Sequence, residues 1–359
     1  MTSIQVIYGD NPQAMIREVL DRLRPGAGLS ADTSIAIKPN LVNASPAEKG
    51  ATTSPRLVEG IIVYLQDQGL SELTIMEGSW AGGSTDRAFR KCGYRELSRK
   101  YGVPLVDLKQ DSYREFSAGN LTLKVCEQPL AVDYLINVPV LKAHSQADLT
   151  CALKNLKGCI PDTEKRRYHR LGLDRPIAAL NTVLQSDLII VDALQGDLTF
   201  EDGGNPVTMN RLLVGKDPVA IDAYGARLIG YKPHDIEYIE LAAELGLGSS
   251  DLSEIEIVEY NQGLKDKSSF QHSRKTRRLA RRLEAREACS ACYGSLLHAL
   301  QRLKETGELD ELERIYIGQG FQGKSRSGPG IGNCTREFER FLPGCPPSAG
   351  EIREFLRNV

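Results

Sequence analysis

The sequence has no long apolar run and no large excess of charge of either sign. No stretch of the 359 residues approaches the roughly 18–20 consecutive apolar residues that cross a bilayer, so we expect no membrane-spanning segment. Residues 1–10 show no basic region followed by an apolar run, which predicts that there is no secretory signal peptide and that the protein is cytoplasmic. The net charge of −2 predicts no general attraction to nucleic acid.

Two common signatures of cofactor binding are absent as well. The glycine-rich stretch Glu77–Thr85 has neither the G-x-G-x-x-G spacing nor that of a Walker loop. A turn of this kind before a helix can bind an anion, or its serine and threonine can simply cap the helix, and both readings stay open. The cysteines do not form the C-x-x-C-x-x-C run of a bacterial ferredoxin.

The composition that remains is that of an ordinary soluble globular protein, with 41% hydrophobic and 26% charged residues. Residues 1–262 alternate short apolar runs with amphipathic stretches, which predicts an α/β fold in which a mostly parallel or mixed sheet carries helices on both faces. Strands are expected at Ile4–Tyr8, Ser34–Lys38, Leu73–Glu77, Pro104–Leu108, Leu121–Cys126 (an antiparallel edge strand), Tyr134–Val138, Leu188–Asp192, Arg211–Val214 and Ile255–Glu259. Helices are expected at residues 11–23, 55–68, 84–100, 173–185, 217–229 and 235–246.

The composition changes abruptly after residue 262, which predicts a basic linker helix over 263–286 and a small C-terminal module over 287–359. Arginines and lysines crowd into 274–286, so this segment could dock a redox partner protein, or it could be a solvated connector. Because aromatic residues do not interleave with the basic ones, nucleic acid is not an expected partner.

Eight cysteines in a chain with cytosolic features favour metal binding or catalysis over disulfides. Four of them, Cys289, Cys292, Cys334 and Cys345, lie in the C-terminal module. The first two are a C-x-x-C pair, which one turn places side by side. Glycines precede Cys334 and prolines follow Cys345, so backbone can approach a bulky inorganic group and then turn away from it. We therefore predict a 4Fe–4S cluster held by these four thiolates.

Other readings of the four cysteines stay open. Structural zinc usually takes two short-spaced pairs, and only the first pair here is short. A thioredoxin-like redox pair would leave Cys334 and Cys345 without a role. The cysteines could also be inert and buried, as free cysteines often are. That last reading is the one we adopt for Cys92, Cys126 and Cys151, whereas Cys159 receives no role.

The element Gly344-Cys-Pro-Pro347 resembles the last cluster-ligand motif of the hydrogenase small subunit and of the small iron–sulfur subunit of respiratory complex I. The resemblance covers about the last 70 residues and differs in the order and spacing of the earlier cysteines. It implies the cofactor and does not imply the reaction.

A second group of candidate residues follows a strongly apolar strand, between Val138 and Gly158. This segment carries lysines and a histidine that could bind a carboxylate or phosphate, with the histidine as acid or base. A solvated helix face is the structural alternative. The candidates for ligand binding here are Lys142, Lys154, Asn155 and Lys157, and the candidate for catalysis is His144.

Several motifs resemble family 362 of the domains of unknown function. They are Lys38-Pro-Asn40, Glu77-Gly78, Val138–His144, Ala152–Gly158, Gly203–Pro206 and Gly215–Ala223. Members often carry an iron–sulfur module in the same chain. The resemblance implies that Lys38, Asn40, His144, Lys154 and Asn155 line a shared site, with Lys38 a second catalytic candidate and Asn40 a ligand-binding one.

The sequence thus supports three hypotheses. The first is an iron–sulfur protein that carries single electrons to or from a substrate or cofactor in the α/β domain, as a possible oxidoreductase. The second is a non-redox enzyme or binding protein for an anionic small molecule, with a structural metal site. The third is a factor that assembles or matures the metal centre of another protein, which it contacts through the basic helix.

Overall fold

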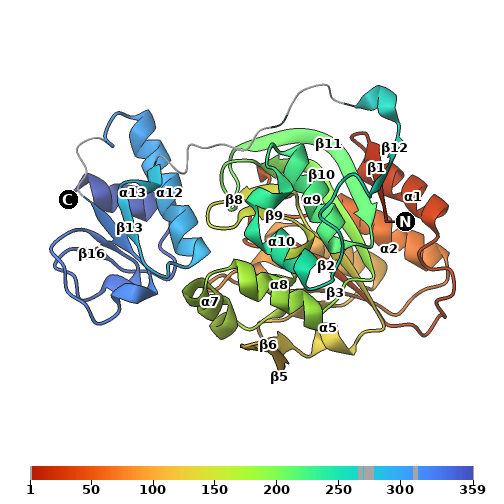
Figure 1. Cartoon of the computed structure of the whole chain (residues 1–359), viewed down its shortest axis with the longest axis horizontal. Helices are drawn as coiled ribbons and strands as arrows, with labels where there is room; N and C mark the ends of the chain where they lie inside the picture. Colours follow the sequence, from red (N-terminus) through yellow and green to blue (C-terminus); the bar gives the residue numbers. More distant parts are fainter. Residues whose placement is uncertain (1, 266–269, 271–278, 310–313, 359) are drawn as a thin grey trace.

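A mixed sheet of eight strands forms the centre of the part of the chain that the structure, a computed structural model, describes: residues 2–265, 270, 279–309 and 314–358 (Figure 1). Most neighbours are parallel, and β11 runs antiparallel to both of its neighbours, β1 and β10. In spatial order the strands are β12 (Glu256–Tyr260), β1 (Ser3–Tyr8), β11 (Pro206–Gly215), β10 (Leu188–Asp197), β7 (Tyr134–Val138), β2 (Ile35–Pro39), β3 (Leu73–Glu77) and β4 (Leu105–Asp107). The predicted α/β fold with a mixed sheet is confirmed.

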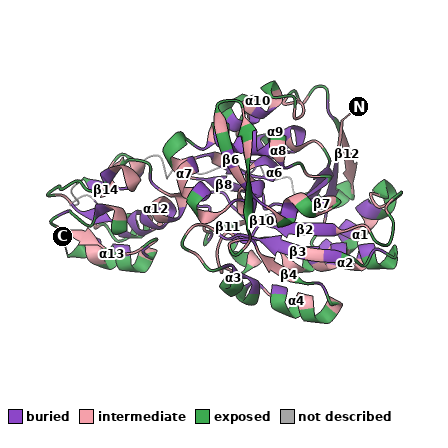
Figure 2. Ribbon diagram, turned by 90° about the horizontal axis from the view of Figure 1, so that it is seen from below, coloured by how far each residue is buried: buried purple, intermediate pink, exposed green. Residues whose placement is uncertain are grey.

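Two hydrophobic cores lie on opposite faces of this sheet because side chains along a strand alternate between its faces. In β10, for example, Ile189 and Val191 belong to one core and Ile190 to the other. One face packs against α1 (Pro12–Leu23), α2 (Pro55–Asp67), α3 (Thr85–Lys91) and α4 (Tyr94–Tyr101). The other packs against α6 (Ala152–Asn155), α7 (Asp162–Leu171), α8 (Asp174–Val183), α9 (Pro218–Leu228) and α10 (Glu237–Glu244). Figure 2 shows buried strands between partly exposed helices.

Three local predictions need correction. The helix expected over 84–100 is broken into α3 and α4 at Gly93, which has a φ of +81° that continues no right-handed helix. Leu121–Cys126 is strand β6, but it pairs with β5 (Tyr113–Ala118) in a hairpin separate from the central sheet. The strands β10 and β11 are about twice as long as expected, because they continue as a two-stranded ribbon beyond the sheet.

The sequence analysis did not anticipate several short elements between β6 and β10. They are α5 (Gln128–Ala131), α6, α7 and a two-stranded hairpin of β8 (Lys142–His144) and β9 (Asp148–Thr150).

The C-terminal part has its own small parallel sheet and its own core (Figure 1). Its elements are β13 (Leu283–Ala285), α12 (Ser290–Glu305), β14 (Ile315–Ile317), β15 (Gly330–Ile331), β16 (Phe341–Leu342) and α13 (Ala349–Arg357). The predicted basic linker helix over 263–286 is wrong near its end, where Leu283–Ala285 is a strand. Residues 266–269 and 271–278 of that prediction lie outside the described residues.

No helix within the described ranges is long and apolar enough to cross a membrane.

Candidate functional site

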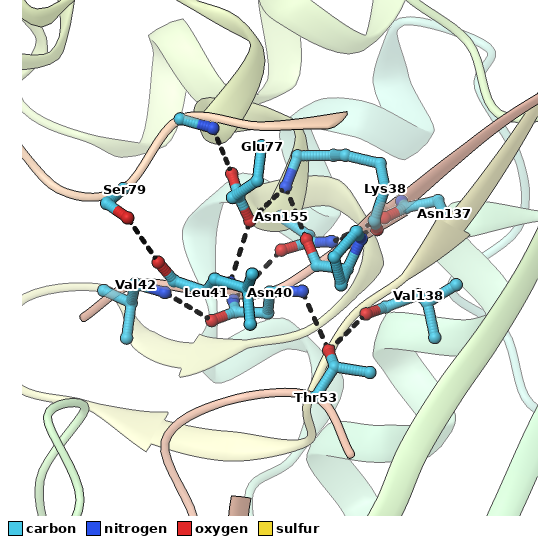
Figure 3. A network of polar contacts seen from close by, with 12 residues as sticks. Lys38, Asn40, Leu41, Val42, Thr53, Glu77, Ser79, Asn137, Val138 and Asn155 are labelled. Atoms are coloured by element: carbon cyan, nitrogen blue, oxygen red, sulfur yellow. Dashed lines mark hydrogen bonds and ion pairs between the residues drawn. The ribbon is translucent and has the colours of Figure 1, made fainter. Parts of the chain in front are cut away.

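The site lies where β2, β3 and β7 end, at the carboxyl edge of the sheet. The chain leaves β2 toward β3 on one side and returns through β7 on the other, and open α/β sheets bind ligands at such a switch point. A chain of side-chain amides joins the end of β2 to β7 (Figure 3). Asn40 donates to Asn155 at 3.0 Å, and Asn155 donates to Asn137 at 2.8 Å. The network fixes the segment 152–158 against the sheet.

A buried ion pair stands beside this network. The Nζ atom of Lys38 lies 2.8 Å from Oε2 of Glu77, and the two side chains are 0% and 3% exposed. Glu77 also accepts the backbone N–H groups of Leu41 at 2.9 Å and Gly78 at 2.7 Å. A Cβ atom at Gly158 would stand 2.0 Å from Oε1 of Glu77, so only glycine permits this close packing. Lys38 therefore holds the site together from beneath.

A cavity of about 90 Å³ opens above the network and is rich in lysine. Side chains from both the α/β domain and the C-terminal module line it. They include Asn40, Trp80, Lys142, His144, Lys154, Asn155, Lys157, Lys165, His169, Glu201, Cys289 and Ser290. The structure thus brings together the predicted residues Asn40, Lys142, His144, Lys154, Asn155 and Lys157. Lys38 does not line the cavity, and it contacts the site through Glu77, Gly158 and Asn155, whose side-chain amide donates to the backbone oxygen of Lys38 at 3.3 Å.

Two of the cavity lysines have no acidic partner among the described residues. The Nζ atom of Lys154 donates to the hydroxyl of Thr150 at 3.1 Å, and that of Lys157 lies 3.4 Å from Nε2 of His169. Burial, reinforced by the neighbouring ammonium groups, lowers the pKa of Lys154 well below its usual value and that of Lys157 to about 8. Both lysines therefore lose their proton at a lower pH than an exposed lysine does, unless an anion binds beside them.

Lys142 and Lys165 are held more firmly, by carbonyl groups. Lys142 donates to the backbone oxygens of Ala51 at 2.6 Å and Glu201 at 2.7 Å, and burial lowers its pKa to about 8. Lys165 donates to the backbone oxygens of Gly78 and Ser79. These two ammonium groups add positive potential to the cavity while fixing its walls.

His144 has a defined tautomer. Its Nδ1 accepts the backbone N–H groups of Gln146 and Ala147, each at 3.1 Å, so the proton resides on Nε2. That nitrogen lies 3.9 Å from Oε1 of Glu201. Burial lowers the pKa of His144 well below its ordinary value. In this state Nε2 is a donor, and the acceptor beside it is the Glu201 carboxylate.

Glu201 is a cavity residue that the sequence analysis missed. It is buried, it accepts from the hydroxyl of Ser145 at 2.8 Å, and burial raises its pKa. The signal in the sequence was its place two residues before Gly203–Pro206. A Cβ atom at Gly294 of α12 would stand 3.1 Å from Oε1 of Glu201. His169 and Lys165 were missed because helix α7 was missed.

Other carboxylates near the edge of the sheet accept hydrogen bonds from backbone N–H groups. Asp192 accepts the N–H of Ser54, at the start of α2, at 2.7 Å. Asp222 accepts the N–H of Ala152, at the start of α6, at 2.7 Å, rather than complementing its own helix. The glycine-rich stretch likewise ends in a cap, because Ser84 accepts the N–H of Arg87 at the start of α3.

The four C-terminal cysteines line one cavity of about 400 Å³. Arg166 and Arg336 also line it, and side-chain amides donate to two of the sulfur atoms: Gln319 to Cys289 and Gln322 to Cys334, each at 3.6 Å. No three histidine, cysteine or acidic side chains in the described chain are placed to hold a single metal ion. Zinc draws its thiolates to about 2.3 Å from one centre. A wide cavity with four thiols and N–H donors fits a larger group of the iron–sulfur type better.

Cys289 lines both cavities, and so forms part of the wall between them. Contacts between the C-terminal module and the α/β domain hold this wall in place. Ser290 donates to the side chain of Gln146 at 2.8 Å, and Gln319 donates to the backbone of Arg166 at 3.0 Å. A Cβ atom at Gly82 would stand 2.1 Å from the backbone oxygen of Cys345, so the glycine-rich stretch packs against the module.

The remaining cysteines, Cys92, Cys126, Cys151 and Cys159, are buried, and all eight cysteines are free thiols. Burial raises the pKa of Cys92 to about 11 and that of Cys126 to about 12. They are therefore unreactive packing residues, as expected for the first three.

The family match lies within the α/β domain. Residues 35–227 match the family described as "Domain of unknown function (DUF362)". The thylakoid-associated protein sll1697 of Synechocystis sp. is 26% identical over 223 residues, covering 59% of this chain and 68% of that protein. Among solved structures, the lactate racemase apoprotein of Thermoanaerobacterium thermosaccharolyticum aligns with a TM-score of 0.42 at 12% identity, over 62% of this chain and 56% of its own. A Thermotoga maritima protein aligns with a TM-score of 0.40 at 14% identity, over 66% and 60%.

Proposed function

Since the chain belongs to the DUF362 family, whose description names no chemistry, we propose its function from its own side chains: an iron–sulfur protein that exchanges single electrons with a small molecule in the lysine-lined cavity. The observation that carries this proposal is the position of Cys289. A redox group held by its thiolate would adjoin the space where a ligand can bind. None of the eight cysteines, all within the described residues, forms a disulfide, and the proposed cluster needs four of them reduced, so we propose a cytoplasmic location.

In this proposal Cys289, Cys292, Cys334 and Cys345 hold a 4Fe–4S cluster. Such a cluster supplies or takes up one electron at a time. The amides of Gln319 and Gln322 donate to two of the ligand sulfurs, which stabilises their negative charge.

The other residues act on the small molecule. Lys154 and Lys157 bind its negative charge. Glu201, facing the cavity with its raised pKa, exchanges a proton with it, and Nε2–H of His144 orients the Glu201 carboxylate. The C-terminal module contributes the first turn of α12 to the wall of the cavity.

Anaerobic purification followed by iron and sulfide analysis tests the cluster. We expect about four iron and four sulfide per chain and absorption near 400 nm. Serine at Cys292, Cys334 or Cys345 should lower the iron content sharply. The matched control is Cys92→Ser: Cys92 donates to the backbone oxygen of Ser45 at 3.2 Å, a contact that a serine hydroxyl can keep. Colourless, iron-free wild-type protein would overturn the proposal.

The lysine-lined cavity also favours a second candidate, a non-redox enzyme or binding protein for an anion, with a structural metal site. The two candidates differ in one measurement. Under the first proposal, a bound substrate should increase the rate at which chemically reduced protein is reoxidised. Under the second, no ligand should change that rate.

A further inference from the structure

The lysine-lined cavity has a definite charge balance. Its acidic residues are Glu77 and Glu201, and Glu77 is already paired with Lys38 beneath the cavity. Glu201 is therefore the single unpaired carboxylate that, among the described lining residues, faces the ammonium groups of Lys142, Lys154 and Lys157. Lys142 is buried, and Lys154 and Lys157 are half-buried. An excess of positive charge at such positions is costly unless an anion compensates it. The cavity is built to be neutralised by a ligand.

The cavity also meets the beginning of a long helix. Ser290 and Ala291, the first residues of the 16-residue helix α12, belong to its wall. The residue before them, Cys289, provides no side-chain hydrogen bond to cap the helix. The N–H of Ser290 donates to Nε2 of His169 at 3.4 Å. The N–H groups that follow it in the first turn have no partner within their helix, and the helix dipole makes this end positive. The lysines of the cavity belong to the α/β domain, whereas the helix end belongs to the C-terminal module.

The size of the cavity limits the anion. The cavity volume of about 90 Å³ is several times the roughly 10–15 Å³ that one water needs on the same measure, so a small anion of a few non-hydrogen atoms fits. The two lysines without an acidic partner among the described residues match the two oxygens of a carboxylate. A phosphate group has five non-hydrogen atoms and more oxygens to satisfy.

We propose that the cavity binds the carboxylate of a small carboxylic acid between Lys154, Lys157 and the first turn of α12. The ligand thereby bridges the α/β domain and the C-terminal module. This inference deepens the proposed function and rests on it for the electron transfer, because it names the substrate class of the same cavity. The binding itself requires only the geometry of the lysines and α12.

Acetate is the probe, with acetamide as a neutral molecule of the same shape and phosphate as the larger anion. Titration calorimetry of the full, iron-loaded chain at low ionic strength should show saturable 1:1 binding of acetate. For four non-hydrogen atoms the dissociation constant can reach about 0.05 mM at best. Acetamide should not bind, and phosphate should bind more weakly than acetate.

The variant Lys157→Gln should weaken acetate binding by about tenfold to a hundredfold, the loss expected for one charge-assisted hydrogen bond. Lys157→Arg keeps the charge and should retain most of the affinity, which separates lost charge from lost folding. The control Lys91→Gln removes an exposed lysine in the last turn of α3 and should bind like wild type. Hydrogen exchange of residues 289–293 should slow with acetate in wild type and not in Lys157→Gln.

The inference is overturned if acetate does not bind, if acetamide or phosphate binds as tightly, or if Lys157→Gln binds acetate like wild type. Iron analysis of the same samples separates the two proposals. Iron-free protein that still binds acetate refutes the electron carrier alone, whereas iron-loaded protein that ignores acetate refutes the carboxylate site alone.

Discussion

Replacing Lys38 by methionine tests whether this residue serves the stability of the site. The substitution removes an ammonium group that is 0% exposed and lies 2.8 Å from Oε2 of Glu77. The Glu77 carboxylate would stay buried with only the N–H groups of Leu41 and Gly78 to compensate its charge. Breaking a buried pair on one side costs about 3–5 kcal/mol, so Lys38→Met should lower the free energy of unfolding by that amount.

At about 2 °C per kcal/mol for a domain of this size, the melting temperature should fall by roughly 6–10 °C. Urea unfolding followed by far-UV circular dichroism measures the same loss as a shift in midpoint at unchanged slope. A double-mutant cycle with Glu77→Gln isolates the pair. The double variant should be more stable than the sum of the single losses predicts, because neither member then leaves an unpaired charge.

An exposed ion pair provides the control. Arg99 and Glu96 are 3.3 Å apart on α4, with side chains 76% and 63% exposed. Arg99→Met should change the free energy of unfolding by at most about 0.5 kcal/mol. A loss below about 1 kcal/mol in Lys38→Met would refute the structural reading. Combined with a large loss of turnover, it would return Lys38 to the catalytic role that the family resemblance suggested.

Three further outcomes follow from the geometry. Burial lowers the pKa of Lys157 to about 8, so its ammonium group loses its charge above that pH. The affinity for acetate, measured by calorimetry, should therefore fall between pH 7 and 9. An affinity that does not change with pH would contradict the role of Lys157 in binding the carboxylate. Burial raises the pKa of Asp222 from 3.8 to about 7, so the folded state holds this proton more tightly and stability should fall as pH rises through that window. Asp222→Asn should lessen this fall in urea titrations from pH 4 to 7, and an unchanged slope would count against it. Gln146 donates to the backbone of Ala288 at 2.9 Å, so Gln146→Ala should speed hydrogen exchange at the start of α12, while unchanged exchange would show that docking does not depend on it.

The local sequence predicted the elements whose pattern repeats over a few residues. Leu73–Glu77 and Tyr134–Val138 are strands with the expected bounds, since short apolar runs between turns favour buried strands. The local sequence did not predict correctly the features that depend on a pairing partner far away in the chain. Leu121–Cys126 alternates like an edge strand, but only the tertiary structure shows that its neighbour is β5 and not the central sheet.

The candidate site shows the same division. The motif residues Asn40, Lys154 and Asn155 were predicted to lie together, and they do. Glu201 lies two residues before the motif Gly203–Pro206, but that motif does not indicate that Glu201 lies beside His144, 57 positions earlier in the chain.

By itself, the sequence determined the alternation of strands and helices, the lysine and asparagine motifs, and the four cysteines with their spacing, because these are written in residues near one another. The tertiary structure alone decided that Lys38 pairs with Glu77 and that Cys289 stands between two cavities. Both depend on contacts between segments far apart in the chain, such as the bond from Ser290 to Gln146 across 144 positions. Such contacts form only when burial of the whole core holds the segments together.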